Sequence, residues 1–199
     1  MAPLSTSAQF QCEIGSGTGE AAKPSSGMPL NLTSEFLKSL HLDRAQLWLN
    51  ARQTQLLHEL YDLLDIHTDG KWNDAIFYEF MKHVTDLTDR RIIRVFDMLD
   101  KGCRGFIIFE EFYVLVCLMV AAYNKLEKKF ILRHAKMCFT LMDEDFSGSI
   151  SAKEFTDVGF LWNLEENQIL RIFKEYDVNG DAEIDWEEFR FFAMAALSD

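Results

Sequence analysis

Oxygen-bearing side chains recur at regular intervals along one stretch of the chain, 143–154. The series consists of Asp143, Asp145, Ser147, Ser149, Ser151 and Glu154. A hard cation such as Ca²⁺ binds roughly six to eight oxygen atoms at distances of about 2.3–2.6 Å. The spacing of the series lets a short length of backbone wrap around one such ion. This stretch, which we call loop 3, therefore predicts a calcium site.

Loop 3 resembles the calcium loop of EF-hand proteins. Gly148 holds the sixth position, where the chain bends sharply, and Ile150 holds the eighth, where it can join a short β-bridge to a partner loop. The predicted ligands are the side chains of Asp143, Asp145 and Ser147, the carbonyl of Ser149, a water molecule held by Ser151 and both carboxylate oxygens of Glu154. The resemblance implies one bound Ca²⁺ ion.

A second stretch, 177–188, follows the same pattern, and we call it loop 4. Its predicted ligand positions are Asp177, Asn179, Asp181, Glu183, Asp185 and Glu188. Ala182 replaces the glycine expected at the sixth position, and an alanine held at positive φ costs about 1 kcal/mol. Asp185 adds a further carboxylate at the ninth position, which should partly offset this strain. We therefore predict two Ca²⁺ sites in the chain.

Loop 2, at 100–111, keeps the frame of a calcium loop but loses its ligands. Gly102 offers no side-chain oxygen at the third position, and Arg104 places a guanidinium at the fifth. A guanidinium repels Ca²⁺ and can pair with Asp100 or Glu111 instead. We therefore predict that loop 2 binds no metal.

Loop 1, at 65–76, departs further from the pattern. Ile76 stands where the closing bidentate carboxylate is expected. EF-hands fold in pairs, and an empty loop still completes the β-bridge of its partner, so we expect a scaffolding role. His67 could bind a softer metal or titrate near neutral pH, although a solvated loop histidine is the preferred interpretation.

The residues between the loops predict helices. Apolar side chains recur at helical spacing after residue 31, and no proline follows that point. The aspartates that open the four loops are separated by 35, 43 and 34 residues, which indicates four helix-loop-helix repeats arranged as two pairs. We predict an all-α fold of two EF-hand pairs in two lobes, with short β-bridges between paired loops. The predicted divisions are a disordered tail at 1–30, an N-terminal lobe at 31–123 and a C-terminal lobe at 124–199.

The negative charge of the chain is concentrated around loops 3 and 4. Asp and Glu number 32 against 20 Lys and Arg, a formal charge of −12. Residues 143–199 contribute −11 of this, from 15 acidic and 4 basic residues, and residues 1–142 contribute −1, from 17 and 16. A polyanion has no electrostatic reason to approach nucleic acid or anionic membranes. We therefore expect neither as a partner.

The remaining composition favours an intracellular protein. Four cysteines without paired spacing, Cys12, Cys103, Cys117 and Cys138, predict free thiols in a reducing compartment. The chain does not open with a basic segment followed by an apolar one, and its apolar run at 112–123 is shorter than the roughly 20 residues of a spanning helix. We predict a cytoplasmic protein without membrane insertion.

Beyond the loops, residues 43–197 resemble EF-hand proteins of the sperm flagellum. The similarity is carried by FYEFMKHVTDL at 77–87, VFDMLD at 95–100 and FYVLVC at 112–117, and it continues at 124–127 and 130–134. The best-known member of that family is an accessory subunit of the CatSper cation channel. The resemblance implies a location in the cilium or flagellum of sperm and a channel subunit or axonemal protein as partner.

Three functions are compatible with these patterns. The leading hypothesis is a calcium sensor that exposes an apolar groove to a partner helix when its C-terminal loops fill. The candidate groove residues are Met137, Phe139, Met142, Phe155, Phe173, Phe189, Phe192 and Met194. The alternatives are a structural subunit docked permanently through apolar surface near 106–109 and 114–120, and a calcium buffer. We do not expect an enzyme, because no nucleophile with a positioned base, phosphate loop or zinc spacing is evident.

Overall fold

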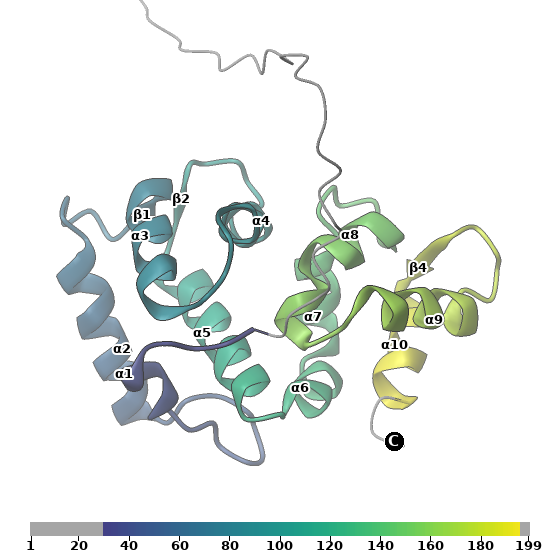
Figure 1. Cartoon of the computed structure of the whole chain (residues 1–199), viewed down its shortest axis with the longest axis horizontal. Coiled ribbons are helices and arrows are strands. Elements are labelled where there is room, and N and C mark those ends of the chain that lie inside the picture. Colours follow the sequence, from purple (N-terminus) through teal and green to yellow (C-terminus); the bar gives the residue numbers. More distant parts are fainter. Residues whose placement is uncertain (1–29, 196–199) are drawn as a thin grey trace, which may run out of the picture.

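The computed structural model describes residues 30–195. The predicted tail therefore lies outside the described residues, except for Leu30, which is buried at 5% exposure. The first part of the described chain is mostly helical (Figure 1). Its elements are α1 (Glu35–Lys38), α2 (Ala51–Leu64), β1 (Trp72–Asn73), α3 (Asp74–Val84), α4 (Asp89–Leu99), β2 (Phe106–Ile107) and α5 (Phe109–Tyr123). We refer to residues 30–123 as the N-terminal half.

The C-terminal half, residues 124–195, repeats this order of elements. It contains α6 (Glu127–Arg133), α7 (Ala135–Met142), β3 (Ser149–Ser151), α8 (Ala152–Val158), the 3-10 helix η1 (Gly159–Trp162), α9 (Glu166–Tyr176), β4 (Glu183–Asp185) and α10 (Trp186–Ala195). The mostly helical fold and the small strand pairs are as predicted. The division into two separate lobes stays a prediction.

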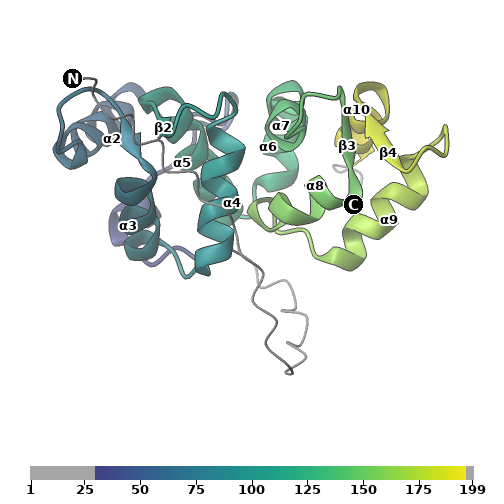
Figure 2. The ribbon, with the colours of Figure 1, turned by 90° about the horizontal axis from the view of Figure 1, so that it is seen from above.

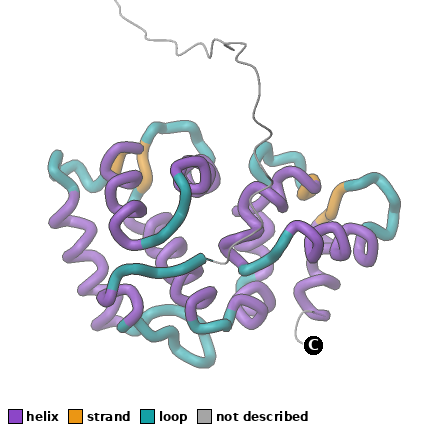
Figure 3. Tube along the Cα trace, viewed as in Figure 1, coloured by secondary structure: helices purple, strands orange, loops and turns teal. Residues whose placement is uncertain are grey.

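Each half contains one antiparallel pair of very short strands, which joins two successive loops (Figure 3). In the N-terminal half, Trp72 of loop 1 pairs with Ile107 of loop 2. In the C-terminal half, Ile150 of loop 3 pairs with Ile184 of loop 4. Loop 1 therefore completes the β-bridge of its partner, as its scaffolding role predicts.

Buried side chains form a continuous apolar core through both halves. Helix α5 lies at the centre of the N-terminal half, and its residues Leu115 to Val120 are fully buried. This burial contradicts the prediction of an exposed apolar surface at 114–120.

Cys117 and Cys138 are free thiols inside the core, and burial raises the pKa of each to about 12.

The two halves touch along several elements. Helix α4 contacts α7 and α8, while α5 contacts α6 and η1; Figure 2 shows α4 beside α8 at the boundary between the halves. A second connection joins Gln46 to the junction of α6 and α7. Arg133 donates to Oε1 of Gln46 at 2.6 Å, and Nε2 of His134 donates to its carbonyl at 2.8 Å.

The segment before α2 packs against the rest of the N-terminal half. Leu32 forms an isolated β-bridge with Thr85, and the amide of Thr33 donates to the carbonyl of Val84 at 2.9 Å. Leu37 of α1 is fully buried, and α1 contacts α5.

Within residues 30–195, no helix has both the length and the apolar character needed to cross a bilayer.

Candidate metal centre

Loop 3 is shaped by the helix end before it and the helix start after it. Asp143 caps the C-terminus of α7, and Ser151 caps the N-terminus of α8. Ser151 and Glu154 form a capping box: Oγ of Ser151 accepts the amide of Glu154 at 3.2 Å, and Oε2 of Glu154 accepts the amide of Ser151 at 2.8 Å. The first, ninth and twelfth positions of the loop are therefore fixed by ordinary helix-capping chemistry.

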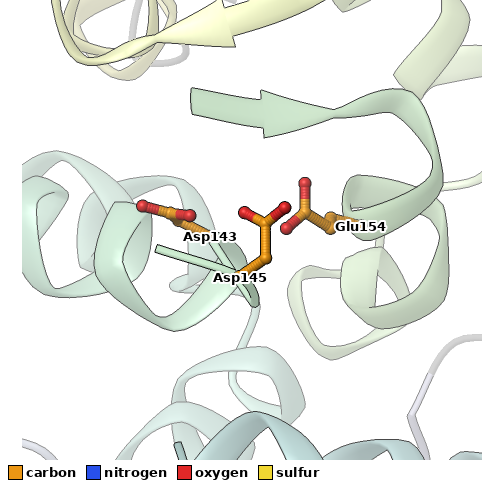
Figure 4. Close-up of side chains that lie close together, drawn as sticks. All are labelled: Asp143, Asp145 and Glu154. Atoms are coloured by element: carbon orange, nitrogen blue, oxygen red, sulfur yellow. The ribbon is translucent and has the colours of Figure 1, made fainter. Parts of the chain in front are cut away.

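Three carboxylates converge in loop 3. One oxygen each from Asp143, Asp145 and Glu154 lies within 4.8 Å of the others, and Figure 4 shows the three side chains turned toward a common space. Asp143 and Glu154 are buried at 7% and 8% exposure, whereas Asp145 is exposed. Like charges this close repel unless a cation lies among them. The cluster therefore has the charge and the donor atoms of a calcium site.

The serines of loop 3 add oxygen atoms to this cluster. Oγ of Ser147 lies 3.5 Å from Oδ1 of Asp143 and donates to the carbonyl of Ser149 at 3.1 Å. Hydrogen bonds from the side chain and amide of Ser147 lower the pKa of Asp145, which keeps that carboxylate ionised. The converging donors are all oxygen atoms, and they fit Ca²⁺ rather than a softer metal.

Loop 4 repeats the capping arrangement. Oδ1 of Asp185 accepts the amide of Glu188 at 2.9 Å, and Oε2 of Glu188 accepts the amide of Asp185 at 3.0 Å. The carboxylate of Asp177 accepts two loop amides, those of Gly180 at 2.7 Å and Ala182 at 3.0 Å. Its carboxylates are therefore oriented by the same backbone frame as those of loop 3.

The carboxylates of loop 4 are less gathered than those of loop 3. Across residues 30–195, loop 3 supplies the cluster of three metal-ligating side chains that share a common centre. In loop 4, Nδ2 of Asn179 donates to Asp181 at 2.8 Å, and Oε1 of Glu188 accepts the amide of Val178 at 2.9 Å. The carboxylate of Glu183 accepts a hydrogen bond from Oγ of Ser149, and this bond links the two loops. The ligand assignments in both loops stay predictions.

The four loops share an unusual backbone feature. The fourth and sixth positions of each loop both have positive φ, a conformation that costs a residue with a side chain about 1 kcal/mol or more. In loops 1, 2 and 3 the sixth position is glycine, and the fourth positions are Thr68, Cys103 and Phe146. In loop 4 the order is reversed, with Gly180 at the fourth position and Ala182, at φ 65°, at the sixth.

Loop 2 carries its own cation. Nε of Arg104 lies 3.3 Å from Oδ1 of Asp100, and one terminal nitrogen donates to Oε1 of Glu111 at 2.5 Å. The guanidinium thus bridges the first and twelfth positions of the loop, as the sequence predicts. A calcium ion would have to displace this internal charge.

Loop 1 is tied to loop 2 through a buried tyrosine. The hydroxyl of Tyr61 donates to the carbonyls of Gly70 at 3.1 Å and Ile107 at 2.8 Å. The ring of Tyr61 stacks on Trp72 with centroids 4.7 Å apart. Burial, followed by the charge of Asp65, raises the pKa of the Tyr61 hydroxyl, so it stays a donor at all ordinary pH values. Hydrogen bonds and ring packing therefore hold loop 1 against loop 2.

One contact to loop 3 is not predicted by the sequence. Lys101, from the start of loop 2, donates to the backbone carbonyl of Asp143 at 2.5 Å. The two residues are 42 positions apart. No spacing rule within a helix or a loop predicts a contact of this range.

Comparison with known proteins agrees with the geometry. A family model described as "EF hand" matches residues 135–159 and 170–193, which contain loops 3 and 4. The chain is 28% identical to cell division control protein 31 of Saccharomyces cerevisiae over 140 residues, which are 69% of this chain and 83% of that protein. It is 27% identical to centrin-3 of Homo sapiens over 169 residues, 81% of this chain and 95% of that protein.

The chain is also similar to a plant protein. The chain is 29% identical over 149 residues to CML13 of Oryza sativa subsp. japonica, named as a probable calcium-binding protein; the match covers 71% of this chain and 82% of that one. Fold, loop geometry and relatives together define an EF-hand calcium-binding protein. Within that class, the chain is similar to centrin-3 and CML13, and the EF-hand matches indicate Ca²⁺ as its cofactor.

Proposed function

We propose that this chain is a calcium sensor. Loops 3 and 4 each bind one Ca²⁺ ion, and a protein partner recognises the resulting change in helix arrangement. The observation that carries the proposal is the convergence of Asp143, Asp145 and Glu154 within 4.8 Å. The cluster lies between α7 and α8, so an ion bound there acts directly on the angle between two helices. We propose a binding protein rather than an enzyme, since these donors are of the kind that hold calcium.

A cavity in the C-terminal half supports a partner-binding role. It has a volume of about 330 Å³ and lies among α6, η1, α9 and α10. Its apolar lining consists of Ile131, Trp162, Leu164, Ile172, Tyr176 and Phe192. Of the groove residues named from the sequence, Phe192 lines the cavity although it is largely buried, and Phe139, Met142, Phe155 and Phe189 lie in the core. Met137 and Phe173 are partly buried, and Met194 is exposed. A groove made from the four core residues would form only if Ca²⁺ moved the helices apart.

The partner and location belong to the same proposal. The cavity combines apolar and charged lining residues between helices, and such a lining suits an amphipathic helix. The sequence resemblance described above suggests a CatSper-type channel subunit or an axonemal protein, and hence the cytoplasm of a cilium or sperm flagellum.

Calorimetry of the full chain tests the proposal. We expect two calcium sites, of which Glu154→Gln removes one and Glu188→Gln the other. Glu111→Gln, at the equivalent position of loop 2, is the matched control and should leave both sites intact. Binding that Glu154→Gln and Glu188→Gln leave unchanged would overturn the proposal.

A second measurement separates a sensor from a buffer. Calcium should increase the fluorescence of an apolar dye in the wild-type chain but not in the chain that carries both Glu154→Gln and Glu188→Gln. Calcium binding without any dye response would favour a buffer.

A permanently docked structural subunit is the second candidate. The specific observation in its favour is the Arg104 bridge, which holds loop 2 without any ion. A second cavity, lined by Leu64, Ala75, Ile76, Glu79, Phe80 and His83, lies between α2 and α3 of the same half. Capture of the channel or axonemal partner that is equal with calcium and with a chelator would favour this function over a sensor.

A further inference from the structure

The side chain of Lys101 reaches from the metal-free loop 2 into loop 3. Its ammonium donates to the carbonyl of Asp143 and lies 5.3 Å from the ring centroid of Phe146. These residues hold the first and fourth positions of loop 3. A positive charge of the N-terminal half is therefore placed at the edge of the proposed calcium site.

Two arginines of α4 reinforce this contact. Arg94 lies 3.8 Å from Glu144 of loop 3 and 3.5 Å from Asp157 of α8. The guanidinium of Arg91 lies over the ring of Phe160 in η1, 4.5 Å from its centroid. The cations thus come from one side of the boundary, and the acidic and aromatic groups that receive them come from the other. Loop 4 lies at the far end of the C-terminal half, beyond α9 (Figure 2).

The position of Lys101 has opposing energetic consequences. Its charge interacts favourably with Asp143, Glu154, Glu144 and Asp145, and so offsets repulsion within an ion-free loop 3. The side chain is half-buried, and burial of an ammonium costs solvation free energy. The contact is therefore costly to hold, and a competing positive charge can release it.

We propose that Lys101 is a built-in counter-charge of loop 3, which lowers its calcium affinity and is displaced when Ca²⁺ binds. This inference rests on the proposed calcium site in loop 3. Two positive charges entering the carboxylate cluster repel the ammonium, so filling the loop loosens the contact between α4 and the C-terminal half. The coupling is reciprocal, because calcium must weaken the Lys101 contact by the same factor by which the contact weakens calcium binding.

Calcium titrations of the full chain test the affinity. All variants carry Glu188→Gln, so that loop 3 alone is measured. Lys101→Met keeps an apolar stem and removes the charge, and it should tighten calcium binding roughly 3- to 10-fold. Lys101→Arg keeps the charge and should change it little. The matched control is Lys71→Met in loop 1, whose ammonium lies 4.7 Å from the ring centroid of Phe106; it should leave the affinity unchanged.

The outcomes distinguish this inference from the proposed function. A Glu188→Gln chain that binds no calcium at all overturns the loop 3 site and the inference together. Calcium binding that Lys101→Met leaves unchanged or weakens, in a chain with wild-type helical content, overturns the role of Lys101 alone.

Amine labelling tests the displacement in the wild-type chain. Acylation followed by mass spectrometry should show Lys101 reacting at least about threefold faster with Ca²⁺ than with a chelator, because the ammonium leaves its half-buried position. Lys71 serves as the internal control and should react equally in both conditions. Labelling of Lys101 that calcium does not accelerate would refute the displacement.

Discussion

Loops 2 and 3 share one backbone frame and differ in the cation that the frame is built to hold. In loop 2, Oδ2 of Asp100 accepts the amide of Gly105 at 2.7 Å. In loop 3, Oδ2 of Asp143 accepts the amide of Gly148 at 3.1 Å. Both loops also have positive φ at the fourth and sixth positions. The same hydrogen bonds and backbone conformations therefore maintain the frame in both loops.

The difference lies at the fifth position. Loop 2 has Arg104, whose guanidinium bridges the carboxylates of the first and twelfth positions, and loop 3 has Ser147, which leaves that space to an ion. A guanidinium supplies a fixed positive charge, whereas an ion supplies one that depends on its concentration. Loop 2 is therefore neutralised by a charge of its own chain, whereas the calcium site proposed in loop 3 would depend on the concentration of the ion.

The largest predicted effect comes from making loop 3 like loop 2. Ser147→Arg should place a guanidinium between Asp143 and Glu154, as Arg104 lies between Asp100 and Glu111. We expect calcium affinity at loop 3 to fall by at least about 100-fold, because the ion meets a fixed charge and loses a ligand. Calorimetry should then show one site, at loop 4. Ser147→Asn, which keeps an oxygen, is the control and should retain both sites.

A smaller effect is expected when loop 2 loses its internal cation. Arg104→Ala leaves Asp100, buried at 6% exposure, without its charged partner. We expect a loss of about 1–2 kcal/mol in the free energy of unfolding, measured by denaturant in the presence of a chelator. Arg90→Ala on α4 is a surface control for the loss of an arginine. Calcium should stabilise the Arg104→Ala and wild-type chains by the same amount, through loops 3 and 4, since Gly102 still supplies no ligand in loop 2. Full stability of that chain would show that the bridge contributes nothing.

The features that the sequence predicts are those set by residues within one loop or one pair. The Arg104 bridge, the pairing of Ile150 with a partner loop and the positive φ of Ala182 each follow from position in a repeating frame. A frame of this kind is local, so its geometry depends on few residues and can be inferred without the rest of the molecule.

The features that the sequence does not predict depend on how the repeats pack together. The contact of Lys101 with Asp143 spans 42 residues, and that of Arg133 with Gln46 spans 87. Helical periodicity marks Phe139, Phe155 and Phe189 as apolar but cannot separate a groove from a core, and these three are buried. The cavity around Trp162 can therefore be located only once the packing of α6 against α10 is known.

The smallest predicted effect concerns the reversed order of glycine and side chain in loop 4. Ala182→Gly relieves the strain at the sixth position but adds freedom to the unfolded chain, so we expect a net gain of about 0.5 kcal/mol in the free energy of unfolding. Gly180→Ala should cost a similar amount for the opposite reason. Nothing lies within 4 Å of the added Cβ, so the cost is conformational rather than steric.

The double variant that combines Gly180→Ala with Ala182→Gly gives loop 4 the order found in loops 1 to 3. Its two changes should cancel, leaving the stability within about 0.3 kcal/mol of wild type when measured by denaturant with a chelator. If the double variant is instead as unstable as Gly180→Ala alone, the strain at Ala182 is absorbed elsewhere in loop 4. If it binds calcium as wild type does, the order of the two positions is neutral for the ion, and what distinguishes a calcium loop from its metal-free neighbours is its charge.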